Sequence, residues 1–192
     1  MNHIVVFASG SGTNFQAIID AVEEGRIEAR INGLIASKPG IQALERARKH
    51  NIDTEVLIPS DFDTLAAYET KLLQTLERWD TDLIVLAGYM LKVPTAVLEQ
   101  YPEKVINIHP SLLPKYGGKG FYGSNVHEAV LANGEKESGC TVHYVTEQYD
   151  EGPIIDQVKV PVRETDDAET LAARVLEQEH KLLPRVIADL VN

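Results

Sequence analysis

The sequence is poor in the features that build disulfide-linked, zinc-binding or membrane-spanning proteins. Cys140 is the only cysteine, so no disulfide can form within the chain and no zinc site can rest on several cysteines. No apolar run reaches the roughly 18 residues of a membrane-spanning helix. The N-terminus shows neither a basic leader nor a cleavage signal. We therefore expect a protein of a reducing compartment, the cytoplasm, without a membrane partner.

Basic residues are scarce relative to acidic ones. The chain has 18 Lys and Arg against 29 Asp and Glu, a formal net charge of −11. Surfaces that bind nucleic acids or anionic membranes need positive charge, so we expect neither partner. A small anion held by backbone N–H groups is still compatible with this charge. The histidines include no pair at a metal-binding spacing such as H-E-x-x-H, and we expect no metal.

What the sequence does contain is a regular alternation of short apolar segments and longer amphipathic ones. Short segments followed by amphipathic helices are typical of βαβ units with a mostly parallel sheet. The predicted strands are 3–8, 29–36, 54–58, 82–87 and 104–108. The predicted helices are 14–24, 40–50, 64–79, about 94–101 and 124–133.

The end of the chain has a different pattern. Segments 138–146 and 153–162 alternate in polarity and lie close together, which predicts an antiparallel pair. A long helix follows over about 167–190, with Asp166 and Glu169 as its capping box. The whole pattern predicts an α/β class fold, a Rossmann-like three-layer doubly wound sheet of about seven strands. With 44% hydrophobic residues, the chain can form one domain over residues 1–192.

The stretch S-G-S-G-T-N at 9–14 connects the first predicted strand to the first predicted helix. Glycines allow a sharp turn, and the free N–H groups at the start of a helix favour an anion such as phosphate. A plain tight turn explains the same residues. Thr13 and Gln16 also match a capping box that would use those donors internally. The spacing alone does not choose between these interpretations.

Asn107 and His109 end a predicted strand two residues apart, so both side chains point to the same face. They lie at the carboxyl edge of the sheet, where ligands bind in open α/β folds. Pro110 keeps His109 extended and thus fixes the direction of its ring. A hydrogen-bonded core histidine is the simpler alternative. Asp150 lies in a predicted turn, and sequence spacing cannot bring it to His109.

Three motifs together resemble the folate-dependent formyltransferases. They are N-I-H-P-S-L-L-P-K-Y at 107–116, S-G-S-G-T-N at 9–14 and Y-D-E-G-P at 149–153, and the resemblance extends over essentially the whole chain. The first motif is shared with the methionyl-tRNA branch and with formyltetrahydrofolate hydrolases, which carry extra domains. The motif at 9–14 and the length favour the branch that formylates glycinamide ribonucleotide in purine synthesis.

This resemblance implies a cosubstrate, 10-formyltetrahydrofolate, and an acceptor, glycinamide ribonucleotide, with no metal. Monomer and homodimer both stay open. A hydrolase, a formyltransferase for another small amine and a non-catalytic phosphate-binding module are the alternatives. The implied catalytic residues are Asn107, His109 and Asp150. His109 is expected to act as an imidazolium donor to the oxyanion, with its pKa raised by Asp150.

The resemblance also implies the substrate-binding residues. For the ribonucleotide phosphate and the glycinamide group they are Gly12, Thr13, Asn14 and Glu179. For the folate they are Leu86, Met90, Leu91, Lys92, Val93, Leu98, Asn107 and Thr146. The Leu113–Pro114 bond is a candidate cis peptide. Leu65, Leu91 and Leu176 stand where the family often has polar or charged residues.

Overall fold

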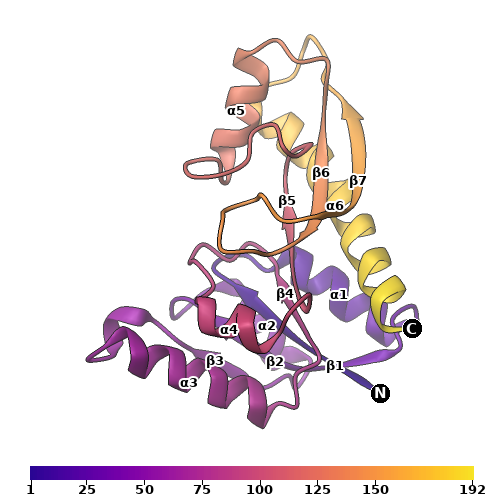
Figure 1. Ribbon diagram of the computed structural model, residues 1–192. Coiled ribbons are helices and arrows are strands. Elements are labelled where there is room, and N and C mark those ends of the chain that lie inside the picture. The colour runs from indigo at the N-terminus through magenta and orange to yellow at the C-terminus, as the bar shows by residue number, and fades with distance from the viewer.

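A single seven-stranded sheet organises the protein, and the computed structural model describes residues 1–192 (Figure 1). The strand order is β3-β2-β1-β4-β5-β6-β7. The strands are β1 (Asn2–Ala8), β2 (Ala29–Ala36), β3 (Thr54–Val56), β4 (Leu83–Leu86), β5 (Val105–His109), β6 (Glu137–Tyr144) and β7 (Ile154–Pro161). The first five are parallel, whereas β6 runs antiparallel to β5 and β7 antiparallel to β6. The predicted sheet and its antiparallel pair are confirmed.

Helices cover both faces of the sheet, as predicted for a three-layer fold. One core contains residues of α1 (Thr13–Glu23), α2 (Gln42–Lys49), α5 (Ser124–Ala132) and the long C-terminal helix α6 (Ala168–Val191). The other contains residues of α3 (Leu65–Arg78) and α4 (Thr95–Gln100). A short 3₁₀ helix, η1 (Pro59–Asp61), precedes α3.

The two cores meet at the central strands because successive side chains of a strand point to opposite faces. In β1, Ile4 and Val6 belong to the core under α1 and α6, while Val5 and Phe7 belong to the core under α3. All four are fully buried. A strand buried on both faces explains why its sequence is continuously apolar rather than alternating.

The helix caps differ from the predicted ones. In α6 the N-cap is Asp167, whose carboxylate accepts from the Thr170 backbone N–H at 2.8 Å, and Asp166 pairs with Arg174 instead. The Asp166 and Glu169 capping box is therefore wrong by one residue. In α1 the N-cap is Gly12 at φ 72°, with no side-chain cap, so the capping box that Thr13 and Gln16 could have formed is absent.

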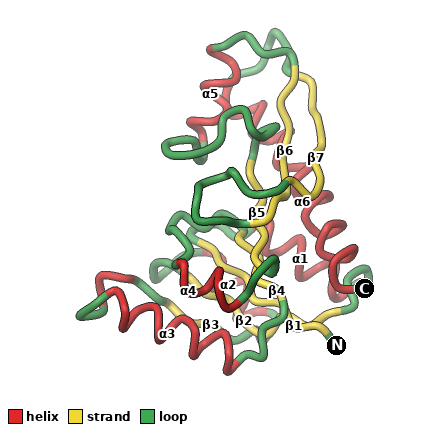
Figure 2. Tube along the Cα trace, in the orientation of Figure 1, coloured by secondary structure: helices red, strands yellow, loops and turns green.

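The chain ends lie near each other, while the long loops gather elsewhere. Figure 1 shows the N- and C-terminal ends side by side, and the Asn2 side-chain amide donates to the Val191 carbonyl at 2.6 Å. Figure 2 shows two long loops in green on one side of the sheet, one following β5 and the other joining β6 to β7. None of the helices combines the length and the apolar character needed to cross a membrane.

Candidate active site

The first part of the site is the point where the strand order reverses, between β1 and β4. Parallel sheets bind ligands at this point, beyond the carboxyl ends of the strands. The Ser9 N–H donates to the Gly88 carbonyl at 3.0 Å, and the Met90 N–H donates to the Ser9 hydroxyl at 2.8 Å. The turn after β1 and the loop after β4 are therefore held together.

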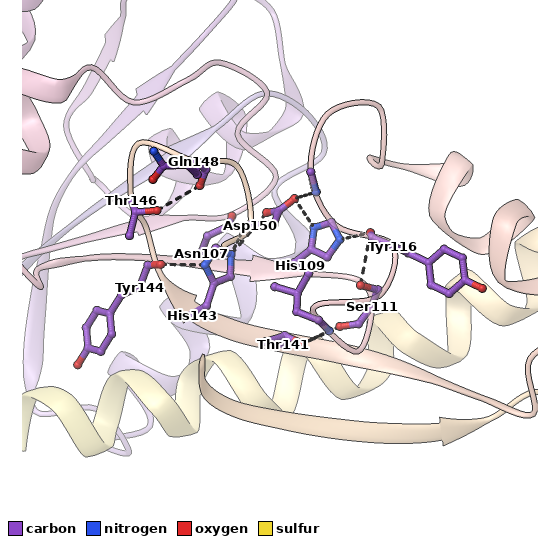
Figure 3. Close-up of polar contacts among 12 residues, drawn as sticks. Asn107, His109, Ser111, Tyr116, Thr141, His143, Tyr144, Thr146, Gln148 and Asp150 are labelled. Carbon is purple, nitrogen blue, oxygen red and sulfur yellow. Dashed lines mark hydrogen bonds and ion pairs between the residues drawn. The ribbon is translucent and has the colours of Figure 1, made fainter. Parts of the chain in front are cut away.

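The second part is the end of β5, where Asn107 and His109 point to the same side (Figure 3). Asn107 lies opposite His143 of β6 in the strand register. The His143 Nδ1–H donates to the Tyr144 carbonyl at 2.9 Å, so Nε2 of this ring accepts from the Asn107 amide at 3.1 Å. This contact fixes which end of the Asn107 amide faces His143.

The loop between β6 and β7 brings Asp150 to the same place (Figure 3). One Asp150 oxygen lies 3.6 Å from His109 Nδ1, and the other lies 3.6 Å from His143 Nε2. The three predicted catalytic residues thus converge from β5 and from a turn 41 residues further along the chain. Neither here nor elsewhere is a group of three or more His, Cys, Asp or Glu side chains arranged to hold a metal ion.

The orientation of the His109 ring is set by the backbone behind it. Its Nε2–H donates to the Tyr116 carbonyl at 2.7 Å. A carbonyl can only accept, so Nε2 carries a proton and Nδ1 is the nitrogen that faces Asp150. The intervening Leu113–Pro114 peptide is cis, as predicted.

The pKa of His109 contradicts the sequence-based expectation. Burial lowers the pKa of His109 below its ordinary value, and this effect exceeds the opposing effect of the Asp150 carboxylate. Asp150 does act in the predicted direction, but His109 is only 5% exposed and the loss of hydration outweighs it, so the net shift in this pKa is opposite to the predicted one. Burial raises the pKa of Asp150, but the His143 and His109 rings, in their protonated forms, and the Gly118 amide together hold it below its ordinary value.

Two buried histidines of the site were not predicted from the sequence. His143 orients Asn107 and contacts Asp150, and the strand pairing of β6 with β5 was the signal that could have found it. His127 of α5 has a lowered pKa because of burial and of the nearby charge of His109. Its Nδ1 is buried without a hydrogen-bond partner. No sequence motif marks His127.

The predicted ribonucleotide-binding residues form a second cluster at the start of α1. The first hydrogen bond of this helix runs from Gln16 N–H to the Gly12 carbonyl, so the preceding N–H groups have no acceptor within the helix. The Asn14 amide donates to the Glu179 carboxylate of α6 at 2.7 Å. Glu179 is 7% exposed, and burial raises its pKa. Asn14 Oδ1 is buried without a partner.

A basic side chain and a cavity adjoin this turn. The Arg46 guanidinium donates to the Ser11 carbonyl at 2.8 Å from α2. A cavity of about 390 Å³ opens beside Thr13, with Arg46 and His180 among its lining residues. The start of α1 is therefore accessible and polar.

The predicted folate residues divide into two groups. Met90 is 49% exposed, and the Lys92 ammonium lies 5.9 Å from the centre of the Tyr149 ring. This contact joins the loop after β4 to the turn before Asp150. Thr146, in the same turn, donates to the Gln148 carbonyl at 3.2 Å. Apart from Asn107 at the end of β5, the remaining members share one apolar cluster: Leu86, Leu91, Val93 and Leu98.

Known proteins share this sequence and this architecture. The Formyl transferase family matches residues 2–187. The phosphoribosylglycinamide formyltransferase of Escherichia coli K12 is 42% identical over 186 residues, covering 97% of this chain and 85% of the relative. That of Bacillus subtilis 168 is 38% identical, with 100% and 96% covered. The crystal structure of glycinamide ribonucleotide transformylase 1 from Geobacillus kaustophilus has a TM-score of 0.93 at 41% identity, covering 100% of both chains. The chain therefore belongs to the formyl transferase family.

Proposed function

We propose that the chain transfers the formyl group of 10-formyltetrahydrofolate to the amine of glycinamide ribonucleotide, giving formylglycinamide ribonucleotide for purine synthesis. The relatives that carry this activity in their names cover nearly the whole chain. The observation that carries the proposal is the convergence of Asn107, His109 and Asp150 at one edge of the sheet. Each supplies a group that formyl transfer between two nitrogens requires.

The reaction begins when the acceptor amine attacks the formyl carbon and negative charge develops on the formyl oxygen. Asn107 has one amide hydrogen committed to His143, which leaves the second free for this oxygen. His109 can donate only through Nδ1, because Nε2 is committed to Tyr116. Burial favours the neutral ring in the free protein, so Nδ1 must take up a proton from solvent, and the developing oxyanion and Asp150 stabilise the resulting charge.

The reaction also moves one proton from the attacking amine to N10 of the folate. A C–N bond forms to the acceptor and the bond from the formyl carbon to N10 breaks. Asp150 is held in its ionised form by its neighbours, so its carboxylate can accept the amine proton, directly or through a water. Returning this proton to N10 completes the transfer without a covalent intermediate on the protein.

The acceptor fits the cluster at the start of α1. Free N–H groups at Gly12, Thr13 and Asn14 and the positive end of the helix suit a phosphate. Glu179 and the unpartnered Asn14 oxygen lie beside them and offer buried acceptors for the hydrogen-bond donors of the glycinamide side. The phosphate and the amine would thus be held by different parts of one cluster.

The donor fits between the loop after β4 and the turn before Asp150. Apolar groups at Leu86, Val93 and Leu98 and backbone groups at 90–93 suit the flat pterin ring. The Lys92–Tyr149 contact joins the two segments at this place. The formyl group would then reach Asn107 at the end of β5.

A coupled absorbance assay tests the proposal. Purified protein is mixed with 10-formyl-5,8-dideazafolate, and loss of the formyl group is followed with and without glycinamide ribonucleotide. We expect turnover only with the ribonucleotide. Equal loss without an acceptor would indicate a hydrolase, and equal turnover with free glycinamide would indicate another amine as the natural acceptor.

A cytoplasmic location and a monomeric or homodimeric state also belong to this proposal. The named bacterial relatives are biosynthetic enzymes, which supports the cytoplasmic location. Light scattering on the eluting peak of a size-exclusion column measures the oligomeric state directly.

A further inference from the structure

The glycine-rich loop after β5 contacts Asp150 directly. The Gly118 N–H donates to an Asp150 carboxylate oxygen at 2.9 Å, and the same oxygen lies 3.6 Å from His109 Nδ1. The Asp150 side chain is only 13% exposed, so few solvent contacts compete with this amide. A buried carboxylate depends strongly on the donors that remain to it.

The same short segment also holds His109. Two residues before Gly118, the Tyr116 carbonyl accepts the His109 Nε2–H at 2.7 Å. Tyr116 is anchored in turn, because its hydroxyl donates to Glu135 at 3.0 Å. Its ring packs edge-on against Phe121, with centroids 5.9 Å apart. Both titratable groups are therefore tied to one anchored piece of backbone (Figure 3).

The two glycines of the loop constrain the contact to different degrees. A Cβ at Gly117 would lie 2.5 Å from Leu113 Cδ2 and 3.1 Å from Asp150 Cβ, so either the Leu113 side chain or the loop would have to shift. Gly118 has φ +88°, a conformation that residues with a side chain rarely adopt. The left-handed backbone is a physical reason for a glycine at position 118, which the proposed function leaves unexplained.

We propose that the backbone of Tyr116–Gly118 is a positioning element that sets the spacing between His109 and Asp150, through one carbonyl and one amide. The inference rests on the proposed function for its effect on turnover, but the contact itself does not. The amide stabilises the ionised carboxylate, which is the form that accepts the amine proton. It also holds that carboxylate at the distance from which it stabilises a charged His109.

A matched pair of variants isolates the contact. Gly118→Ala and Gly120→Ala place a methyl group at φ +88° and φ +91° in the same loop, and neither new Cβ has a heavy atom within 4 Å. Only Gly118 donates to Asp150. The Asp150 carboxyl is followed by carbon-13 NMR across a pH titration, with Asp150→Asn to assign its signal. We expect Gly118→Ala to raise the pKa of Asp150 and Gly120→Ala to leave it unchanged.

Turnover supplies the second readout. We expect Gly118→Ala to lower kcat about tenfold while both KM values stay within about twofold, because it disturbs alignment rather than binding. Equal effects of the two variants on the pKa of Asp150 would overturn the inference. A wild-type protein that does not formylate glycinamide ribonucleotide would overturn the proposed function instead, since the titration uses no substrate.

A measurement on the unaltered protein guards against a variant that fails to fold. An amide hydrogen-bonded to a carboxylate changes its chemical shift when that carboxylate titrates. We expect the Gly118 amide signal of the wild-type protein to move with the titration of Asp150, while the Gly120 amide does not. A Gly118 signal that stays constant through this titration would contradict the inference.

Discussion

At the scale of single residues, the buried carboxylate of Glu179 lowers the stability of the fold at neutral pH and is proposed to bind glycinamide ribonucleotide. Its raised pKa means that folding favours the protonated form, so its contribution to stability is lost as the pH rises through the folded-state pKa. At neutral pH, Glu179→Gln should therefore raise the melting temperature and also raise the KM for glycinamide ribonucleotide about tenfold. Thermal unfolding and initial-rate kinetics measure the two effects.

The exposed neighbour Glu177 supplies the matched control for this prediction. Glu177→Gln removes the same charge from the same helix without touching Asn14. Glu177→Gln should change neither the melting temperature nor the KM for glycinamide ribonucleotide. A Glu179→Gln protein that is both less stable and unchanged in KM would show that the carboxylate is structural.

His109 is the residue on which the oxyanion stabilisation depends. His109→Asn should lower kcat by about 10²–10³-fold, because the only donor that can gain a full charge beside the formyl oxygen is lost. His3→Asn, in the first half of β1 and far from its carboxyl end, should leave kcat unchanged. Steady-state kinetics test this, with circular dichroism as the check that both variants fold. A His109→Asn enzyme with wild-type turnover would refute the role.

The site shows which residues a sequence can reveal. The two-residue spacing of Asn107 and His109 indicated that both side chains lie on the same face of the strand, and Pro110 indicated the direction of the His109 ring. The assignment of Asp150 to the site came only from the resemblance to the family. The loop between β6 and β7 brings Asp150 to His109, and sequence spacing does not predict this contact. His143 was missed because its role comes from register with β5, which no local pattern contains.

At the scale of elements, the turn from β1 to α1 determines whether a phosphate can approach. Gly12 has φ +72°, and a Cβ there would lie 2.8 Å from Ala43 Cβ of α2. Gly12→Ala should therefore displace the turn and raise the KM for glycinamide ribonucleotide at least about tenfold, with the folate KM unchanged. Initial rates with each substrate varied in turn measure this.

Gly10 in the same turn is the control. A Cβ at Gly10 meets no heavy atom within 4 Å, and its φ is not in the left-handed region. Gly10→Ala should leave both KM values near those of the wild type. An equal rise in the KM for glycinamide ribonucleotide in the two variants would mean that the geometry of the turn at Gly12 does not determine phosphate binding.

Elements were predicted better than their ends. The strand and helix positions follow from apolar periodicity, a property of many residues at once. Each cap depends on a single side chain, and two candidate capping side chains bind other residues. Asp166 pairs with Arg174 rather than capping α6. Gln16 forms hydrogen bonds with Asp20 and Arg46 rather than capping α1. Such competition is decided by tertiary contacts that sequence spacing does not show.

At the scale of the whole molecule, stability should fall as the solution becomes mildly acidic. Burial lowers the pKa values of His109, His127 and His180, so the fold favours their neutral forms. Stability from these groups is present above the unfolded-state pKa and is lost as the pH falls toward the folded-state values. The contribution of these three rings to the free energy of unfolding should decrease from about pH 7.5 to about pH 5.5, and should outweigh the opposite effect of Glu179.

His127→Gln tests the cause of this loss. It removes one buried titrating ring, so the decrease in unfolding free energy over the same pH range should become smaller. Urea unfolding at several pH values measures the slope. An unchanged slope would assign the acid sensitivity to other groups.

The expectation of one domain remains a prediction about the whole chain. Both cores share the same sheet, with alternate residues of β1 in each, so they should unfold together. We expect a single calorimetric transition whose measured and van't Hoff enthalpies agree. Two separate transitions would show that the two sides of the sheet are independent.

The most direct test of the proposed reaction follows the formyl carbon itself. The protein is incubated with 10-formyltetrahydrofolate carrying carbon-13 in the formyl group and with glycinamide ribonucleotide, and the label is located by NMR. We predict that the label moves to the amine nitrogen of the ribonucleotide, with loss of this transfer in His109→Asn. Appearance of the label as free formate at the same rate without the ribonucleotide would contradict formyl transfer as the function.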